Sequence, residues 1–416
     1  MADSHTLSHG AAIAWRAWCR PVANGLLVGL TGYVSTVPLV IAALVAAGAQ
    51  REQVTAALAV LGLCMGVSAM VLSACYRSPF SVGWSTGAAA LLVAQGPVPG
   101  GLRAAAGAFL LAGLLTMLSG LSRRLARALQ AMPAGVCSAM LAGVLAKPCV
   151  VPLWALIHGP WAPWSIALTW LAVRCISRPW ALPAALVVAL WSAPSAAGLW
   201  AVAPSEPLMP RIVAPQLDLQ GIASLALPLY VVTLLSQNAP ALGLLRAFGY
   251  RARPRQVLLC TGAASMAGAF FGCLGVSLAT VTAAMCAGPD SGPNRERRWA
   301  AAGVAGLCQV ALGLAAGLVA PRLMALPAQV VGTLVALALL STFLAAIRAS
   351  VRAAWVGWGP ALGVALTFLV ACGGGAWLGA GSTACAVLAG LACHHLHRRM
   401  DRSRDTRFTS ESDGRA

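Results

Sequence analysis

Long apolar stretches alternate with short polar segments along nearly the whole chain, which predicts a bundle of membrane-spanning helices. Most stretches can cross a hydrocarbon core of roughly 30 Å as a helix that rises about 1.5 Å per residue. Two stretches, the third and the tenth, are too short, and we expect them to be half-helices. The fourteen predicted segments are 22–47, 54–73, 80–94, 103–120, 133–147, 162–176, 180–200, 221–238, 256–271, 276–288, 299–320, 327–345, 354–370 and 376–396.

The composition supports an integral membrane protein. Hydrophobic residues make up 59% of the chain and charged residues only 9%, whereas a soluble domain carries roughly 25% charged residues. The net charge of +18 does not indicate nucleic-acid binding, because the basic residues lie in short loops and in the C-terminal tail. With the N-terminus inside, 23 of the 28 basic residues fall in predicted cytoplasmic segments. This asymmetry predicts that both termini lie in the cytoplasm and that membrane lipid is a partner.

The order of the short segments predicts two inverted repeats. They are seven segments apart, and an odd separation reverses the orientation of the second half. Each also runs through a Thr and small residues to a Gly-Pro pair, at 96–97 and 288–289, although a chance likeness between small residues is an alternative. The predicted divisions are a cytoplasmic segment, a first repeat, an extracytoplasmic linker, a second repeat and a disordered basic tail, at 1–21, 22–200, 201–220, 221–396 and 397–416.

Polar side chains within these apolar segments predict a ligand site. The apolar run that begins near Pro228 ends in Ser236, Gln237 and Asn238. We expect the helix to stop there and the amides to line a cavity, because an unpaired amide in hydrocarbon costs several kcal/mol. The half-helix N-termini, expected near Gly83 and Ser277, would offer free N–H groups and a partial positive charge to an anion.

Other side chains complete the predicted site. Ser85, Thr86 and Thr280, with Ser277, would add hydroxyl donors, and Tyr33 with Trp84 would supply an apolar wall with a polar edge. No acidic residue falls inside a predicted span; Asp290, just beyond the tenth segment, is the remaining candidate for proton coupling. The alternative for Asp290 is a solvated loop residue near arginines.

Other chemistry was weighed against transport. Residues 83–87 match the G-x-S-x-G pattern of serine hydrolases, but no histidine falls at mid-membrane to serve as a base. The glycines and serines could instead let helices pack closely. The only lysine, Lys147, is not in a phosphate-binding loop. We therefore predict neither an enzyme nor a cofactor or metal site.

Several motifs, kept in order over roughly 22–390, resemble the BenE family of bacterial benzoate/proton symporters. They are GYVST at 32–36, WST at 84–86, SAMLAGVL at 138–145, LPL at 227–229 with SQN at 236–238, LRA at 245–247 with GY at 249–250, and TAA at 282–284 with Cys286 and GP at 288–289. The resemblance implies a fold similar to uracil permeases and sulfate-type anion transporters: fourteen spans in core and gate domains, with the ligand between the third and tenth segments. It also adds Ser35, beside Tyr33, to the site.

The chain departs from the family pattern at the expected site. Ser277 stands where the family often has Asn, and Asp290 and Gly292 replace a Glu and a His. The shorter side chain widens the expected substrate from benzoate to an aromatic or other small organic acid. The resemblance thus implies import of an aromatic carboxylate across the bacterial inner membrane by proton symport, with a homodimer expected by analogy. Alternatives are a carrier of another small organic anion or a nucleobase, and an anion channel.

Overall fold

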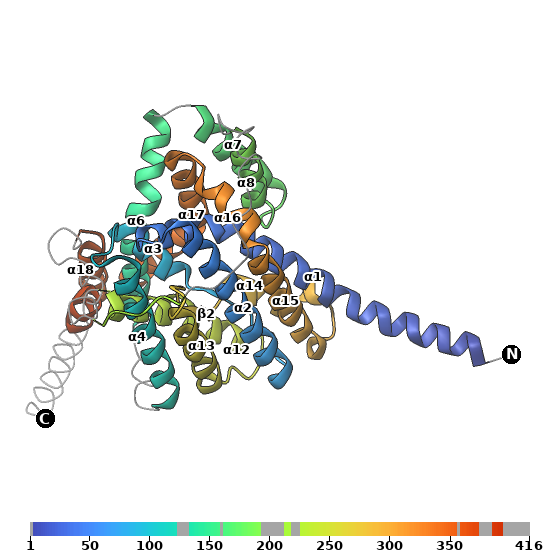
Figure 1. Cartoon of the computed structure of the whole chain (residues 1–416). Helices are drawn as coiled ribbons and strands as arrows, with labels where there is room; N and C mark the ends of the chain where they lie inside the picture. Colours follow the sequence, from blue (N-terminus) through green and yellow to red (C-terminus); the bar gives the residue numbers. More distant parts are fainter. Residues whose placement is uncertain are drawn as a thin grey trace, which may run out of the picture.

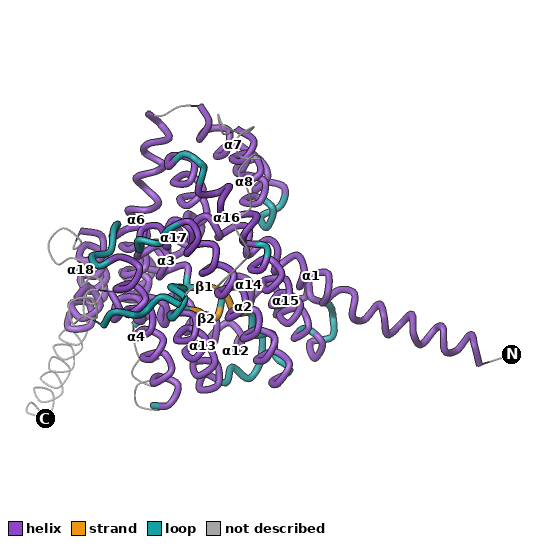
Figure 2. The backbone as a smooth tube through the Cα atoms, viewed as in Figure 1, coloured by secondary structure: helices purple, strands orange, loops and turns teal. Residues whose placement is uncertain are grey.

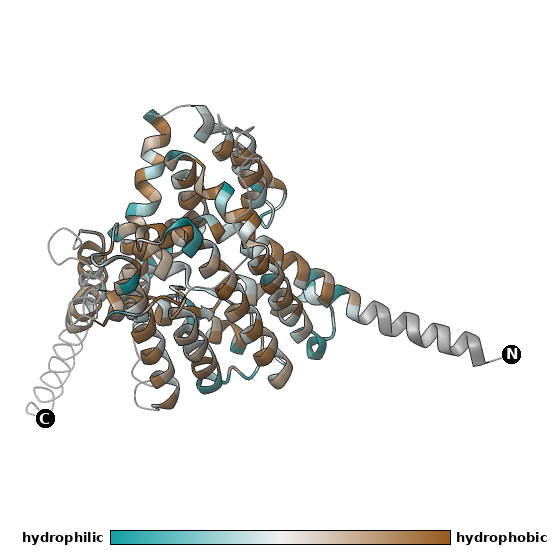
Figure 3. Cartoon of the chain, in the orientation of Figure 1, coloured by the Kyte–Doolittle hydropathy of each residue, from teal (hydrophilic) through white to brown (hydrophobic). Residues whose placement is uncertain are grey.

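The computed structural model describes residues 3–122, 133–158, 161–192, 212–217, 225–355, 358–373 and 385–393. The tail at 397–416 and most of the linker at 201–220 lie outside these residues. Apart from two short strands, the described chain is helical (Figure 1), as predicted. Figure 3 shows hydrophobic residues along most helices and hydrophilic ones mainly at helix ends and loops.

The helices follow one another along the chain with short connections. Those before the linker are α1 (Asp3–Ala46), α2 (Arg51–Tyr76), α3 (Thr86–Gln95), α4 (Gly101–Leu121), α6 (Ala134–His158), α7 (Trp161–Ile176) and α8 (Ala181–Ser192). Those after it are α11 (Leu227–Thr233), α12 (Ala239–Ala247), α13 (Pro254–Ala269), α14 (Thr280–Ala287), α15 (Trp299–Leu314), α16 (Ala316–Met324), α17 (Ala328–Ala354) and α18 (Trp358–Gly373). Helix α1 already begins at Asp3, so no helix boundary lies at the predicted division after residue 21.

Five described helices are long and apolar enough to cross a membrane, or six if α15 and α16, bent by 64°, form one broken span. Several other predicted segments are shorter apolar helices, among them α3, α7, α8 and α18. The chain is thus an integral membrane protein with many helices, while the count of fourteen stays a prediction.

A two-stranded ribbon lies at the centre of the helices (Figure 2). Strands β1 (Val82–Trp84) and β2 (Val276–Leu278) pair antiparallel, with Gly83 opposite Ser277. Two backbone bonds of 3.0 Å extend the pairing, from Ser85 N to the Gly275 carbonyl and from Ala279 N to the Ser81 carbonyl. Branched and aromatic side chains favour this extended backbone.

The ribbon corrects the expected starts of the half-helices. Helix α3 begins at Thr86 and α14 at Thr280, so the helices start three residues after the positions expected from the sequence. Because the strands are antiparallel, the two helix N-termini lie at opposite ends of the ribbon. The strand ends that precede them, Trp84 and Leu278, are two residues apart along the ribbon, roughly 7 Å, and each helix begins two residues beyond its strand. Both short helices predicted from segment length are present.

The eighth predicted segment does not end at Asn238. A π-helical turn, η2 (Leu234–Asn238), joins α11 to α12 without a break. Pro240 has no N–H for the carbonyl of Ser236, four residues earlier. The chain accommodates this loss by widening one turn, in which the Ala239 N–H bonds the Leu234 carbonyl, five residues earlier. The expectation of a helix end was therefore wrong, but the polar residues do lie at an irregular turn.

Glycine contacts bring α15 close to α1 and α2. A Cβ on Gly66 of α2 would lie 2.3 Å from the Gly306 carbonyl oxygen, and one on Gly62 2.7 Å from Gly313 Cα. On α1, a Cβ on Gly25 would lie 2.5 Å from a carbonyl oxygen of α15. Small residues allow helices to pack backbone to backbone. This packing supports the ribbon, because Gln309 of α15 donates a 3.1 Å hydrogen bond to the Val82 carbonyl.

Candidate functional site

The N-terminus of α3 is closed by protein groups. Ser85 is the N-cap, and its Oγ accepts a 3.2 Å hydrogen bond from the backbone N of Ala88. Thr233 of α11 donates a second hydrogen bond of 2.7 Å to the same oxygen. The Ser85 hydroxyl is thus an acceptor in a buried capping arrangement. This arrangement accounts for the serine of the G-x-S-x-G pattern without a nucleophilic role.

The π-helical turn contacts both half-helices. Gln237 Nε2 donates a 2.6 Å hydrogen bond to Thr86 Oγ1 at the start of α3. Asn238 Oδ1 accepts a 2.9 Å bond from the backbone N of Leu278 in β2, and Thr280 Oγ1 donates to the Gln237 carbonyl at 3.4 Å. Consecutive residues of one turn thus bind α3 on one side and the start of α14 on the other. The structure brings these predicted side chains together.

Buried hydrogen-bond donors are left over beside the start of α14. Asn238 Nδ2 and Ser277 Oγ have no hydrogen-bond partner among the described residues, and both side chains are 0% exposed. Helix α14 also has no side-chain cap at Ala279, unlike α3. Buried polar groups without a partner are rare and costly, at roughly 1–3 kcal/mol each. These groups can therefore donate hydrogen bonds to acceptor atoms of a ligand beside the start of α14.

Tyr33 and Trp84 pack against each other. Their ring centroids are 4.8 Å apart at an interplanar angle of 54°, and both side chains are buried. Trp84 Nε1 donates a 2.9 Å hydrogen bond to Thr36 Oγ1, while the buried Tyr33 hydroxyl has no partner among the residues that the structure describes. Ser35 is half-buried on the same helix as Tyr33. The structure thus brings the two predicted aromatic residues together, and their role as a wall of the site stays a prediction.

Asp290 is not part of this cluster. It is exposed on a single 3-10 turn, η3 (Pro289–Ser291), after the C-terminus of α14. The eight residues of α14 separate it from Thr280 by roughly 12 Å. At this end, Arg298 donates hydrogen bonds of 2.7 and 2.8 Å to the carbonyls of Ala287 and Gly292. A cation there complements the negative end of the helix dipole.

The structure adds residues that the sequence analysis did not select. Thr233 supports Ser85, and Gln309 holds β1 with its Nε2 while its Oε1 is buried without a partner. Ser81 also donates a 2.7 Å hydrogen bond to Thr282, linking β1 to α14. Thr233 lies four residues before Gln237, which places both on one helix face. That spacing was the available signal; the other contacts join residues far apart in sequence.

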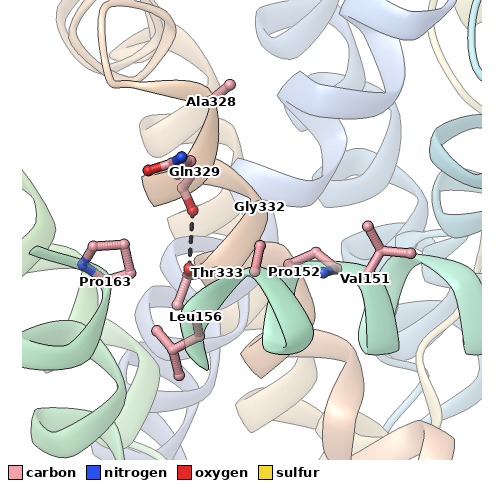
Figure 4. Close-up of a pocket in the computed structure, with 9 residues that line it drawn as sticks. Val151, Pro152, Leu156, Pro163, Ala328, Gln329, Gly332 and Thr333 are labelled. Atoms are coloured by element: carbon pink, nitrogen blue, oxygen red, sulfur yellow. Dashed lines mark hydrogen bonds between the residues drawn. The ribbon is translucent and has the colours of Figure 1, made fainter. Parts of the chain in front are cut away.

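A pocket of about 230 Å³ lies elsewhere, between α6, α7 and α17. Figure 4 shows its mainly apolar lining, including Val151, Pro152 and Leu156, with Gln329 and Thr333 on α17. Thr333 donates its hydroxyl to the Gln329 carbonyl of its own helix at 2.9 Å. Its hydroxyl proton is therefore not free for a carboxylate. Polar chemistry for an anion is found at the ribbon rather than here.

The fold is similar to those of known anion transporters. The structure of SLC26A9 matches with a TM-score of 0.61 at 14% identity, over 91% of this chain and 66% of that one. The transmembrane domain of the cyanobacterial bicarbonate transporter BicA matches with a TM-score of 0.54 at 16% identity, over 90% and 98% of the two chains. At these identities the likeness establishes the fold alone. It confirms the expected likeness to anion transporters.

Sequence comparisons identify nearer relatives. The inner membrane protein YdcO of Escherichia coli (strain K12) is 32% identical over 374 residues, which cover 89% of this chain and 94% of that protein. The benzoate membrane transport protein of Acinetobacter baylyi (strain ATCC 33305 / BD413 / ADP1) is 27% identical over 293 residues, 69% of this chain and 73% of its own. The model of the benzoate membrane transport protein family, BenE, matches residues 18–396, and the chain belongs to this family.

Proposed function

We propose that the protein is a secondary active transporter that imports benzoate or a related aromatic carboxylate by proton symport and alternating access. One observation carries the proposal: in the part of the chain that the structure describes, two fully buried donors, Asn238 Nδ2 and Ser277 Oγ, have no partner beside the uncapped N-terminus of α14. A carboxylate would accept from both and from the first N–H groups of the helix. Family membership confirms the prediction of a membrane transport protein rather than an enzyme.

The chemistry of the cluster favours a singly charged anion. The groups around it are neutral amides, hydroxyls and backbone N–H groups, and the helix dipole supplies about half a positive charge. A second negative charge would have no counter-charge in a buried site. The stacked pair of Tyr33 and Trp84 supports an aromatic ring in the substrate, because it offers ring faces and one free phenol. The name of the Acinetobacter relative supports benzoate.

The proton has two candidate carriers. Asp290 is a carboxylate close in sequence to α14, but it is exposed at the far end of that helix. The substrate carboxylate is the second carrier, because a desolvated acid binds its proton more tightly than in water. Asp290 remains the candidate carrier on the protein. If Asp290 carries the proton, Asp290→Asn should remove the stimulation of uptake by a proton gradient, whereas a proton carried by the substrate would leave that stimulation intact.

Alternating access is needed because the site is closed. Ser85, Asn238 and Ser277 are all 0% exposed, so a substrate reaches them only after a movement. We propose that α3, α14 and the π-helical turn move as one core against a gate. In this proposal fourteen spans form inverted repeats at 22–200 and 221–396, joined by a linker at 201–220. The protein would lie in the inner membrane as a homodimer with both termini in the cytoplasm.

The test is uptake of radiolabelled benzoate into proteoliposomes with and without an inward proton gradient. We expect saturable uptake that the gradient stimulates. Asn238→Asp keeps an oxygen for the Leu278 N–H but replaces the free donor with an acceptor, so uptake should be lost while the protein stays folded. Flux that does not depend on the proton gradient and does not saturate would indicate an anion channel. No benzoate uptake by folded protein would refute the substrate.

A second candidate substrate follows from the fold. SLC26A9 is described as an anion transporter and BicA as a bicarbonate transporter. Another small anion would use the same donors but would not need the aromatic pair. Competition against uptake of radiolabelled benzoate separates the two substrates. In Tyr33→Ala, unlabelled benzoate should inhibit this uptake less than in the unchanged protein, whereas inhibition by a small anion such as formate should be unchanged. A nucleobase would be identified by competition from uracil.

A further inference from the structure

Four arginines lie over aromatic rings at connected helix ends and form a continuous band. We name this band the arginine–aromatic rim, and its members are Trp18, Tyr76, Arg77, Tyr250, Arg253, Arg295, Arg297 and Trp299. It includes the first residue of the apolar part of α1, the end of α2, the connection between α12 and α13, and the start of α15. Trp18 and Tyr76 are end residues of helices long enough and apolar enough to cross a membrane, and Arg295 and Arg297 lie at the start of the bent pair that could form one more span.

The middle of the rim is a pair of tryptophans with an arginine on each. Trp18 and Trp299 meet edge to face with ring centroids 6.3 Å apart. The guanidinium carbon of Arg77 lies 4.6 Å from the Trp299 ring centroid, and that of Arg297 lies 5.2 Å from the Trp18 centroid. A guanidinium stacked on a ring keeps its N–H groups at the edge of the plane, where they can bind oxygen atoms.

The flanks of the rim hold their arginines in the same way. Arg253 lies 4.7 Å from the Tyr76 ring centroid and Arg295 4.5 Å from that of Tyr250. The Tyr250 hydroxyl also donates a 3.1 Å hydrogen bond to the Arg295 carbonyl. Gly249, at φ +77°, leaves space for the Arg295 guanidinium, whose nitrogen would be 2.8 Å from any Cβ there. The turn is therefore shaped around this side chain.

The rim carries a strong excess of positive charge. Segments 76–78, 246–255 and 290–299 contain eight arginines and two acidic residues, a net charge of +6 (eight minus two). The two acidic residues, Asp290 and Glu296, are exposed. Among the described residues, each of the four rim guanidiniums lies on an aromatic ring. A ring carries no net charge, so these contacts do not neutralise the positive charge of the arginines. Such a surface needs an anionic partner.

We propose that the arginine–aromatic rim binds the phosphate headgroups of anionic phospholipids in the adjacent leaflet. Tryptophan and tyrosine rings favour the headgroup level of a bilayer, and arginine binds phosphate oxygens bidentately. The position of the rim at the ends of spanning helices places its guanidiniums at the depth of the phosphodiesters. Lipid is thus favoured over a soluble polyanion as the occupant.

The test measures lipid binding, which is independent of transport and of its substrate. The melting temperature of the purified protein in a neutral detergent is measured with phosphatidylglycerol and, separately, with phosphatidylcholine. Native mass spectrometry counts the lipids that remain bound. We expect phosphatidylglycerol to raise the melting temperature and to remain bound, and phosphatidylcholine to do neither. The double variant Arg77→Gln/Arg297→Gln should lose most of this preference. If that variant does not fold, Arg295→Gln alone should lower the number of bound phosphatidylglycerol molecules.

The matched control is Arg174→Gln on α7. Arg174 also stacks on a tryptophan, Trp170, at 5.0 Å, but it lies outside the rim. Removing it takes away one positive charge and one contact of the same type, as Arg295→Gln does, and the lipid preference should be unchanged. An equal loss in the control would show that only overall charge matters and would overturn the proposal. So would an equal thermal shift from inorganic phosphate or a short RNA, because the rim would then not select lipid.

Discussion

Replacing Ser277 by Ala should stabilise the empty protein and weaken substrate binding. The Ser277 side chain is 0% exposed, and its hydroxyl has no partner in the described structure. Burying an unpaired hydroxyl costs about 1–3 kcal/mol. Alanine removes the hydroxyl and keeps the Cβ, so the substitution should recover part of that cost in the absence of substrate.

The effect on binding has the opposite sign. A hydrogen bond to a charged group contributes about 1.5–3 kcal/mol. If the Ser277 hydroxyl donates to the substrate carboxylate, its loss should weaken benzoate binding roughly 10- to 150-fold, since about 1.4 kcal/mol corresponds to a factor of ten. A residue with only a structural role cannot give this combination of higher stability and lower affinity.

The assay is a thermal melt of detergent-solubilised protein, with and without saturating benzoate, together with uptake in proteoliposomes. The control is Ser119→Ala. Ser119 is equally buried, but its hydroxyl donates to the Leu115 carbonyl at 2.7 Å and lies 2.6 Å from the Tyr230 hydroxyl. That variant should melt at a lower temperature and keep its benzoate affinity. A lower melting temperature for Ser277→Ala, with unchanged affinity, would refute the reasoning.

Three further predictions test the packing, the cap and the coupling. Gly66→Ala should reduce the yield of monodisperse protein, because the new Cβ would lie 2.3 Å from a carbonyl oxygen of α15. Gly303→Ala is the control and should not reduce the yield, because a Cβ there has no atom within 4 Å. Size-exclusion chromatography compares the two variants, and equal yields would contradict the prediction. Thr233→Val removes the bond to Ser85 and should cost about 1 kcal/mol, seen as a lower melting temperature; no change would mean the bond contributes nothing. Asp290→Asn should abolish stimulation of uptake by a proton gradient but not benzoate counterflow; retained stimulation would assign the proton to the substrate.

The half-helices could be predicted because length is a property of the sequence. The segments at 80–94 and 276–288 were too short to span, and the structure has short helices there, α3 and α14. The ribbon before them could not be predicted. Each strand has only three residues, all buried, so burial does not alternate along them and the segments are too short for a strand pattern to stand out. Their pairing joins residues nearly 200 positions apart, which no local pattern reveals.

The polar residues of the site were predicted for a reason that was partly wrong. Gln237 and Asn238 were expected at a helix end, because polar residues after an apolar run usually mark one. The helix instead continues, because a π-helical turn accommodates the hydrogen bond that Pro240 cannot donate. Which donors remain free could not be read from the sequence either. Asn238 and Gln237 are both amides, but Gln237 Nε2 is bound to Thr86 and Asn238 Nδ2 is not.

The π-helical turn connects the two half-helices through hydrogen bonds. Gln237 contacts both half-helices, because its Nε2 binds Thr86 at the start of α3 and its carbonyl accepts from Thr280 at the start of α14. Asn238 binds strand β2 through the Leu278 N–H. A carboxylate that engages Asn238 Nδ2 acts on the same amide that holds β2. A shift of that amide moves the turn, and the turn is bonded to α3. Because each bond contributes only about 1 kcal/mol, we expect a substrate bound at Asn238 to rearrange both contacts at little net cost. Such a substrate would be connected to both half-helices while it touches only one side of the ribbon.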